Sequence, residues 1–386
     1  MCTMLITATQ IHDGEKFLPE GSVIELDDQG TIIAIHDASK KAGATFYNGI
    51  LCPGFVNVHC HMELSHMKGV VPEHTGLIPF LQHIPTYRDK FTEEEKTTAR
   101  HQAYTEMYKN GIVAVGDIAN TTDTLDVRAQ DKMHIHTFIE SLGFTEERAE
   151  MMLGFADTTY KAYATQEAKE KILRQSIVPH APYSVSQSLF KLINSHTPQS
   201  LISIHNQESE AEHHFYLNKE GAVNELLAML NINTDFFQPS GKSSLQTYVQ
   251  YFEKEHSFIF VHNTYTGLED AAIGSGTFAQ AYWCLCPNAN MYIENRLPDI
   301  PMLRSEQRNI CIGTDSLASN HQLSILSELQ TINQHYPEIG WETLLRWGTS
   351  NGAKALRMGD MIGTIKQGMQ PGIVLVDING SAKRIL

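Results

Sequence analysis

Two histidines one residue apart carry the strongest chemical signal in the sequence. His59 and His61 follow the apolar run 55–58, which itself follows a proline–glycine turn at Pro53. The run predicts a short buried strand, because it contains β-branched residues and is bounded by a turn. Side chains alternate between the two faces of a strand, so both imidazoles point the same way. Such a pair is half of a site for a first-row metal, and the alternative is two hydrogen-bonded core histidines.

More residues of ligand type stand where later apolar runs end. His205 ends one run, and Glu208 would lie one helical turn away if a helix begins there. His262 ends another run, and Asp315 follows a third. Each residue also has an ordinary interpretation. Glu208 could be solvated in an acidic helix over 208–212. His262 could simply hydrogen-bond at a strand end, and Asp315 could be a helix N-cap.

Strands alternating with helices must bring these residues together. One helix is expected to begin after Thr92, whose hydroxyl precedes three glutamates, and to stop at Gly111. The rhythm predicts an α/β fold, namely a (β/α)₈ TIM barrel, whose active site lies at the carboxyl ends of the strands. The eight expected strands are 55–58, 112–117, 135–139, 176–179, 201–204, 258–261, 281–285 and 310–312.

Both ends of the chain predict a small β domain. Short strand patterns occur at 4–7, 21–26 and 31–35, and an Asp/Gly-containing turn at 27–30 predicts a hairpin. Because so few strands cannot bury a core alone, we expect partners from 363–365, 373–377 and 383–386. The expected domains are therefore residues 1–50 with 363–386, and a barrel over 51–362.

Composition narrows the classes of function. The 386 residues are 42% hydrophobic and 19% charged, as in a soluble globular protein. A net charge of −15 argues against general binding to nucleic acid or membrane surfaces, which need a basic footprint. No apolar run reaches the roughly 18 residues of a membrane span. Residues 1–10 lack the positive region of a signal peptide, and six scattered cysteines form no C-x-x-C pair, so we expect reduced thiols and a cytoplasmic location.

Taken together, the motifs resemble the amidohydrolase superfamily, in its deaminase and chlorohydrolase branch with a single metal. The segment 53–61 resembles that family's H-x-H on strand one, and 205–208 its H-x-x-E. Residues 261–263 and 313–316 resemble its strand-six histidine and strand-eight aspartate. The ending resembles the return of that family to a small β-sandwich, with Pro371-Gly372-Ile373 where Ala-Asp-Leu is usual.

The resemblance implies a ligand set and roles for the neighbouring residues. The metal ligands fall on His59, His61, His205 and Asp315. Strand four ends in Val178-Pro179-His180 and offers no lysine for a second metal, so one divalent ion is expected. Zinc suits three imidazoles and a carboxylate, and Fe²⁺ or Mn²⁺ would also fit.

The chemistry expected from this resemblance is hydrolytic deamination, in which C–NH₂ becomes C=O and ammonia leaves. A metal with an open position lowers the pKa of its water to about 7 and so supplies hydroxide for attack. Asp315 and His262 would orient the water and take its proton, and Glu208 would protonate a ring nitrogen. The zinc fold of cytidine-type deaminases is rejected, because Cys284-Leu285-Cys286-Pro287 does not match P-C-x-x-C.

Four residues are candidates for binding the substrate. His180 and Tyr183 stand in an H-A-P-Y segment that resembles a substrate-contacting segment of purine-ring deaminases, although His180 could also be buried for packing. Glu63 resembles a position in 6-aminodeoxyfutalosine deaminases. Arg296 could bind a carboxylate or be a surface cation. The long segment 67–91 is expected to cover the site.

These observations favour a deaminase of an adenine nucleoside, such as 6-aminodeoxyfutalosine, methylthioadenosine or S-adenosylhomocysteine. A triazine chlorohydrolase, a guanine deaminase or a cyclic-amide hydrolase would use the same site. A metal-binding protein without catalysis is the third alternative. The expected partner is a small molecule, and a homodimer is compatible with the sequence.

Overall fold

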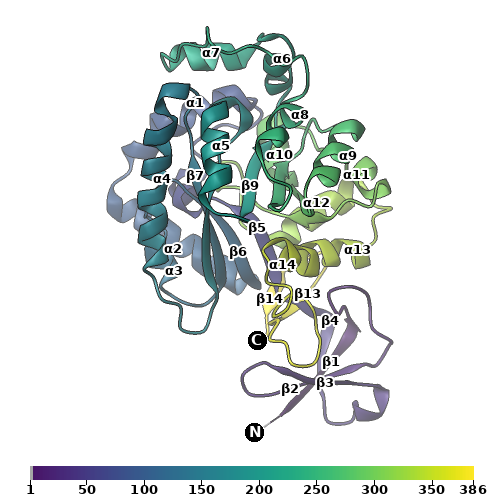
Figure 1. The fold of residues 1–386 in the computed structure, drawn as a ribbon. Coiled ribbons are helices and arrows are strands. Elements are labelled where there is room, and N and C mark those ends of the chain that lie inside the picture. The colour runs from purple at the N-terminus through teal and green to yellow at the C-terminus, as the bar shows by residue number, and fades with distance from the viewer. Residues whose placement is uncertain (1–2) are drawn as a thin grey trace.

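Alternating strands and helices form a barrel in the middle of the chain, as the sequence pattern predicts (Figure 1). The computed structural model describes residues 3–386, so Cys2 lies outside the described residues. The barrel strands pair in parallel within two four-stranded sheets, β5 to β8 and β9 to β12. They are β5 (Phe55–Cys60), β6 (Ile112–Ala119), β7 (His134–Ser141), β8 (Leu173–Pro179), β9 (Leu201–Asn206), β10 (Ser257–His262), β11 (Gln280–Leu285) and β12 (Ile310–Ile312).

Two seams join these sheets into a ring. Between β8 and β9, the backbone amide of His205 donates to the carbonyl of His180 at 3.0 Å. Between β12 and β5, the amides of Thr314 and Asp315 donate to the carbonyl of His59 at 2.9 and 3.1 Å. Both seams therefore run through residues that the motifs singled out.

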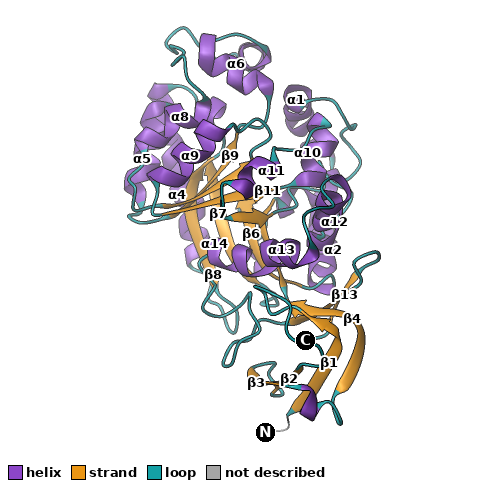
Figure 2. Ribbon diagram, turned by 90° about the vertical axis from the view of Figure 1, so that its right-hand side faces the viewer, coloured by secondary structure: helices purple, strands orange, loops and turns teal. Residues whose placement is uncertain are grey.

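Helices surround the barrel (Figure 2). The capping box of Thr92 and Glu95 begins the predicted helix α2, which ends just before Gly111. Gly111 has φ +87°, and a Cβ there would lie 2.5 Å from Val374. The helices are α1 (Leu77–Tyr87), α2 (Glu93–Lys109), α3 (Leu125–Arg128), α4 (Ala149–Ala164), α5 (Gln187–His196), α6 (Glu210–Asn218), α7 (Ala222–Met229), α8 (Ser244–Tyr248), α9 (Leu268–Thr277), α10 (Pro287–Glu294), α11 (Ile300–Ser305), α12 (Ile325–His335), α13 (Trp341–Arg346) and α14 (Gly352–Ala355).

The side chains of β10 show how the core divides into two layers. Phe258 and Phe260 pack in a cluster that contains residues of α2, α5 and α12. Ile259 and Val261 pack in another cluster, formed largely by other barrel strands. Because alternate residues of a strand face opposite sides, the first cluster lies between strands and helices and the second fills the barrel.

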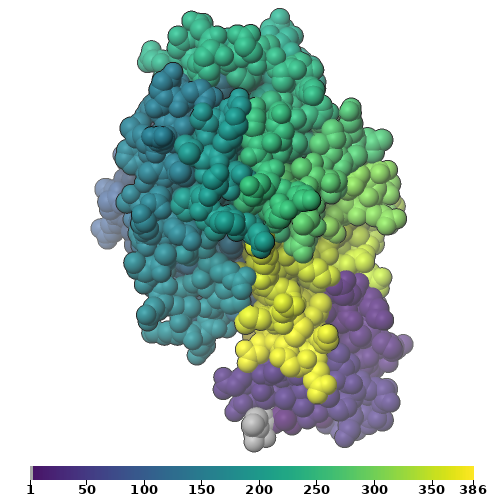
Figure 3. Space-filling view, in the orientation of Figure 1, coloured from purple at the N-terminus to yellow at the C-terminus, as the bar shows by residue number. Residues whose placement is uncertain are grey.

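Both chain ends build one six-stranded sheet at the end of the barrel remote from α6 and α7 (Figure 1). Its order is β14-β13-β4-β1-β2-β3, and the C-terminal segment lies against the N-terminal strands (Figure 3). The hairpin around Asp27 is confirmed, whereas 363–365, expected as a strand, forms none. The strands are β1 (Met4–Ile11), β2 (Val23–Leu26), β3 (Ile32–His36), β4 (Thr45–Pro53), β13 (Ile373–Val376) and β14 (Ala382–Arg384).

The departure at 363–365 has a local cause. Gly363 adopts φ +88°, which turns the backbone out of the extended region. Ile365 then makes a single backbone hydrogen bond, its amide donating to the carbonyl of Asp13 at 2.7 Å. The expected division of the chain at residues 50 and 363 stays a prediction.

Two expectations about the environment can be compared with the structure. Within residues 3–386, no helix has the length and apolar character needed to cross a membrane. The described cysteines are buried free thiols, as expected from their apolar surroundings, and they are Cys52, Cys60, Cys284, Cys286 and Cys311.

The layer between strands and helices generates a stability prediction. Phe260 is fully buried, and its ring centroid lies 4.7 Å from that of Trp283. Replacing it by alanine should lower the free energy of unfolding by about 3–5 kcal/mol, because a cavity remains. Phe155 on α4 is 61% exposed, so Phe155→Ala should change it by less than about 0.5 kcal/mol. Urea unfolding followed by circular dichroism measures both, and equal midpoints would contradict this packing.

Candidate metal centre and active site

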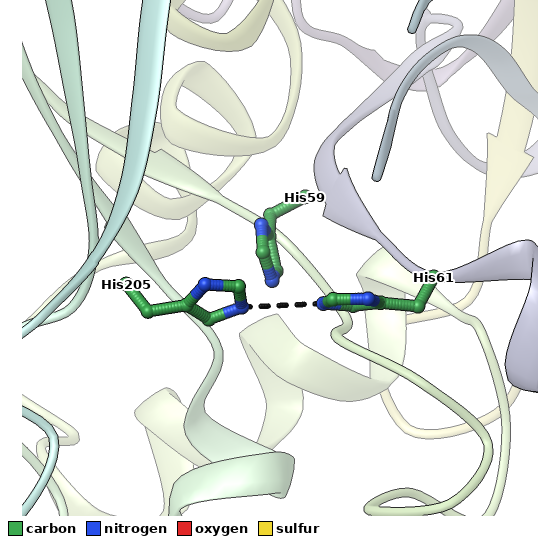
Figure 4. Close-up of side chains that lie close together, drawn as sticks. All are labelled: His59, His61 and His205. Carbon is green, nitrogen blue, oxygen red and sulfur yellow. Dashed lines mark hydrogen bonds between the residues drawn. The ribbon is translucent and has the colours of Figure 1, made fainter. Parts of the chain in front are cut away.

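Residues distant in sequence converge at the carboxyl ends of the barrel strands. His59 and His61 come from the end of β5, and His205 comes from β9 (Figure 4). The Nε2 atoms of His61 and His205 are 3.2 Å apart. Asp315, which follows β12, places Oδ1 3.6 Å from His59 Nε2 and 3.4 Å from His61 Nε2. His262 of β10 forms a further group of possible ligands with His59 and Asp315.

The surroundings of His59 test whether these residues fit a metal ion. The His59 side chain is fully buried, and within residues 3–386 neither of its ring nitrogens has a hydrogen-bond partner. A buried polar group without a partner is costly, and such groups are rare. The possible ligand atoms of His59, His61 and His205 all lie within 4.8 Å of one another. A divalent ion among them would use the unpaired nitrogen of His59, so the donor set fits a first-row metal.

The backbone is strained at several of the strand ends that face this site. Left-handed conformations of residues other than glycine cost roughly 1–3 kcal/mol each and persist only where the surroundings enforce them. Four such residues follow or end barrel strands: Gln207 (φ 48°), His262 (φ 71°), Asn263 (φ 60°) and Asp315 (φ 58°). Beside Asp315, the side chain of Asn57 makes two hydrogen bonds with Thr314. Its Nδ2 donates to Thr314 Oγ1 at 2.8 Å, and its Oδ1 accepts from the Thr314 backbone amide at 3.1 Å. The turn that aims Asp315 is thus fixed from β5.

Gly313 permits the close approach of this turn to β5. A Cβ atom at position 313 would lie 2.8 Å from Cβ of His59 and 2.9 Å from its carbonyl oxygen. No real side chain tolerates such contacts without movement of the strand. Glycine in the motif therefore brings Asp315 up against the first pair of histidines.

Burial sets the protonation of the imidazoles. It lowers the pKa of His59, His61 and His262 to about 4, so these rings are neutral near pH 7. Burial also acts to lower the pKa of His205, but the adjacent Glu140 carboxylate raises it to about 10. A divalent ion would displace the second proton of that ring, so metal uptake should release a proton.

Two carboxyl groups of the site have opposite protonation tendencies. Burial raises the pKa of Glu208 to about 8, which favours the protonated acid at neutral pH. Burial works against ionisation of Asp315 as well, but the neighbouring imidazoles of His59, His61 and His262 hold its pKa well below the usual range. One site therefore holds a proton donor and a carboxylate.

Glu208 is positioned by its neighbours rather than by a helix. The alternative of a solvated acidic helix over 208–212 is wrong, because Glu208 is buried and α6 begins at Glu210 with Ser209 as its N-cap. The Glu212 carboxylate accepts hydrogen bonds from the amides of Gln207 and Glu208, both at 3.2 Å. This carboxylate holds the loop so that Glu208 Oε2 lies 3.6 Å from His262 Nε2. The Tyr183 hydroxyl donates to the Glu208 carboxylate at 3.4 Å.

A family model for amidohydrolases matches residues 50–385. The chain belongs to the amidohydrolase family. It is therefore a hydrolase of carbon–nitrogen bonds, and the resemblance inferred from its motifs is confirmed.

Several proteins similar to this amidohydrolase are named as deaminases of adenosine or aminofutalosine. An adenosine deaminase of Helicobacter pylori is 26% identical over 325 residues, which cover 82% of this chain and 76% of that protein. The crystal structure of H. pylori aminofutalosine deaminase with methylthio-coformycin has a TM-score of 0.82 at 22% identity and covers 99% and 97% of the two chains. An adenosine deaminase of Xanthomonas campestris with bound zinc has a TM-score of 0.74 at 20% identity, with coverage of 98% and 85%. The two structures confirm the barrel fold.

A cavity of about 230 Å³ lies over the site of this amidohydrolase. His180, Tyr183 and Glu208 line it together with the candidate metal donors His61, His205 and Asp315. One face of α1 forms an apolar wall, so the segment 67–91 covers the site as expected. The apolar lining consists of Leu64, Leu77, Phe80, Leu81, Ile84, Pro85, Leu142 and Ile293.

The other two candidates for substrate binding occupy different places. Glu63 is buried beside the cavity, where its carboxylate accepts from the Asn120 amide at 3.1 Å and the Thr121 hydroxyl at 3.2 Å. Arg88, which lines the cavity, approaches Glu63 to 3.8 Å. Arg296 does not line this cavity: it is exposed, and its guanidinium lies 4.4 Å from the ring centroid of Tyr265. A role for Arg296 in binding substrate stays a prediction without a supporting contact.

Sequence reasoning missed three polar residues at the site. Glu140 and Asn120 line the cavity, and Asn290 contacts His262. Glu140 lies at the end of β7, so the strand-end rule applied to His59 and His205 would have found it. Asn290 lies within α10, where no spacing in the sequence links it to β10.

The donor set predicts one zinc ion per chain and a requirement for His59. Removing a direct ligand should weaken zinc binding by on the order of 100-fold or more, since even partners of ligands contribute 10–100-fold. Metal analysis by mass spectrometry after equilibration in buffered zinc measures this for His59→Gln. His256, which is equally buried and contacts Asn194 away from the site, provides the matched control His256→Gln. Equal zinc content in both variants would refute the assignment.

Proposed function

We propose that this amidohydrolase is a zinc-dependent deaminase of adenine nucleosides that carry an apolar 5′ substituent. The observation that carries the proposal is the pairing of a buried, protonated Glu208 with neutral His262 and ionised Asp315 at the edge of the metal-binding donor set. Deamination of a ring needs two functions together, namely a proton for a ring nitrogen and acceptors for the proton of water. The activities named for the relatives support the same reaction.

His59, His61, His205 and Asp315 would hold the metal. When bound, a divalent ion with an open position lowers the pKa of water to about 7 and so supplies a nucleophile at neutral pH. Zinc is proposed because three imidazoles and one carboxylate suit it, and because a relative of the same fold binds it.

His262 is arranged to accept a proton at Nε2. Its Nδ1 lies 3.2 Å from Asn290 Oδ1, while the Asn290 amide nitrogen donates to Thr264 Oγ1 at 2.5 Å. Asn290 therefore presents its oxygen to His262, so the His262 proton lies on Nδ1 and the lone pair on Nε2. This nitrogen faces Glu208 and, with the Asp315 carboxylate, can take the proton released by water.

Glu208 is arranged to donate a proton. Its carboxylic acid can protonate a ring nitrogen of the base, which draws electrons away from the carbon that carries the amine. Water adds to that carbon, and the acceptors pass one of its protons to the amine. Ammonia leaves as the carbonyl forms, and the proton of the added hydroxyl restores the acid form of Glu208. The Tyr183 hydroxyl contacts the same carboxyl group and limits its rotation.

The cavity wall supports a particular class of nucleoside. Leu77, Phe80, Leu81 and Ile84 present an apolar face of α1 beside the donor set. A methylthio or deoxy group at the 5′ position would remove apolar surface from water against this wall. Glu63, held at the other side by Asn120 and Thr121, is proposed to receive the hydroxyl groups of the sugar, and His180 the base.

The proposed substrate class predicts deaminase activity on 5′-methylthioadenosine. The change in absorbance from adenine to hypoxanthine measures this activity. We expect kcat/KM for 5′-methylthioadenosine to exceed that for adenosine by about 10-fold or more, because one apolar group in such a pocket contributes 10–200-fold. A panel that adds aminodeoxyfutalosine, S-adenosylhomocysteine, guanine and a chlorinated triazine tests the alternatives. No change with any adenine nucleoside would refute the proposed function.

Replacing Glu208 separates catalysis from metal binding. Glu208→Gln removes the proton donor but no proposed ligand, so kcat should fall about 10²–10⁴-fold with zinc content unchanged. Glu210 is exposed two residues later, and Glu210→Gln should keep kcat/KM within about twofold of the wild type. Wild-type kcat in Glu208→Gln would contradict its role as the acid.

A further inference from the structure

We propose that Glu140 is a carboxylate that supports the metal centre from behind His205: it orients the His205 ring and places a second negative charge close to a divalent ion. The inference rests on the metal site of the proposed function but not on its substrate. Glu140 is not among the residues that the motifs assigned to binding or catalysis. It is the penultimate residue of β7, two strands away from β9.

Glu140 is held in a fixed position against His205. Its side chain is only 3% exposed, and Oε1 lies 3.2 Å from His205 Nδ1. The other oxygen, Oε2, accepts a hydrogen bond from the Asn120 side-chain amide at 3.1 Å. Both oxygens of a buried carboxylate are thus engaged, and one of them faces a proposed metal ligand.

The contacts of the His205 ring fix which nitrogen can bind a metal. Nδ1 lies 2.8 Å from the His180 carbonyl oxygen and 3.2 Å from Glu140 Oε1, and both of these atoms are acceptors. Nδ1 therefore carries a proton, and Nε2 points to His61 Nε2 at 3.2 Å (Figure 4). A carboxylate behind a histidine in this way fixes the orientation of the ring and makes its other nitrogen a stronger ligand.

The charges of the site favour a second anion close to the metal. Three neutral imidazoles and the Asp315 carboxylate would leave a divalent ion with one uncompensated positive charge in a buried site. Glu208 is protonated and does not supply the missing charge. Glu63 lies beside Arg88, which compensates it. Glu140, in contact with a ligand, is the carboxylate placed to balance the ion.

Glu140, His180 and His205 could themselves be taken for a second metal site, because their possible ligand atoms lie within 4.8 Å of one another. The hydrogen bonds argue otherwise. His205 Nδ1 already donates to the His180 carbonyl, and His180 Nδ1 lies 2.7 Å from the Ser184 hydroxyl. With those nitrogens engaged and His205 Nε2 directed to His61, the group keeps one imidazole nitrogen for a second ion, His180 Nε2, and Glu140 serves as an acceptor rather than a ligand.

Glu140→Gln tests the inference, because it removes the charge and keeps the shape. Competition with a chelator should show zinc binding about 10–100-fold weaker than in the wild type. The visible bands of the cobalt-loaded variant should also shift, since the basicity of a ligand changes. Glu63→Gln is the matched control: Glu63 is another buried carboxylate near the cavity, but it contacts Asn120 and Thr121 instead of a ligand. It should leave zinc affinity and the cobalt spectrum unchanged.

Folding is checked by circular dichroism, and Asn120→Ala provides a second variant. Asn120→Ala frees the Glu140 carboxylate and should weaken zinc binding in the same direction by a smaller factor. The inference is overturned if wild-type protein binds zinc and Glu140→Gln binds it within twofold with an unchanged cobalt spectrum. If the wild type itself binds no zinc, the inference and the proposed metal centre fall together. Loss of deaminase activity alone bears on the substrate assignment only.

Discussion

The hydrogen bonds that close the barrel between β12 and β5 also hold the proposed metal donors together. The backbone amides of Thr314 and Asp315 both donate to the carbonyl of His59. Asn57, which is on β5 like His59, hydrogen-bonds to Thr314. Gly313 makes the approach possible, because any side chain there would collide with His59. At the opposite seam, the carbonyl of His180 accepts from both the backbone and the ring of His205. The positions of the proposed donors therefore depend on closure of the barrel, and the site cannot form before the barrel closes.

Burial turns this geometry into chemistry. In water, Glu208 and Asp315 would both be ionised at neutral pH. Within the barrel mouth, desolvation favours the acid form of Glu208, whereas the imidazoles around Asp315 favour its carboxylate. The environment thus separates two similar groups into a donor and an acceptor, which is the usual sign of acid–base function. The same low exposure leaves His59 without a hydrogen-bond partner among the described residues, and a metal ion would satisfy it.

The cavity above these groups is shaped by a segment that belongs to no barrel strand. Helix α1 presents an apolar stripe at helical spacing, and Arg88 follows it next to the buried Glu63. The arrangement joins a polar region around Arg88 and Asn120 to an apolar region beside it. A loop of this kind can change specificity without disturbing the donors, because they are held by strands on the far side of the cavity.

The sequence by itself determined the barrel, the sheet built from both chain ends, the start of α2 and the identity of the convergent donors. These features depend on local patterns, such as apolar runs bounded by turns, the Thr92–Glu95 capping box and ligand residues at strand ends. Ser209, the N-cap of α6, and Glu212 three residues later are a local signal for the start of that helix. Only the tertiary structure decided that Glu208 is buried beside His262. It also placed Arg296 over Tyr265 and Glu140 behind His205. Pairings between strands depend on closure of the whole barrel, and no local spacing in the chain encodes them.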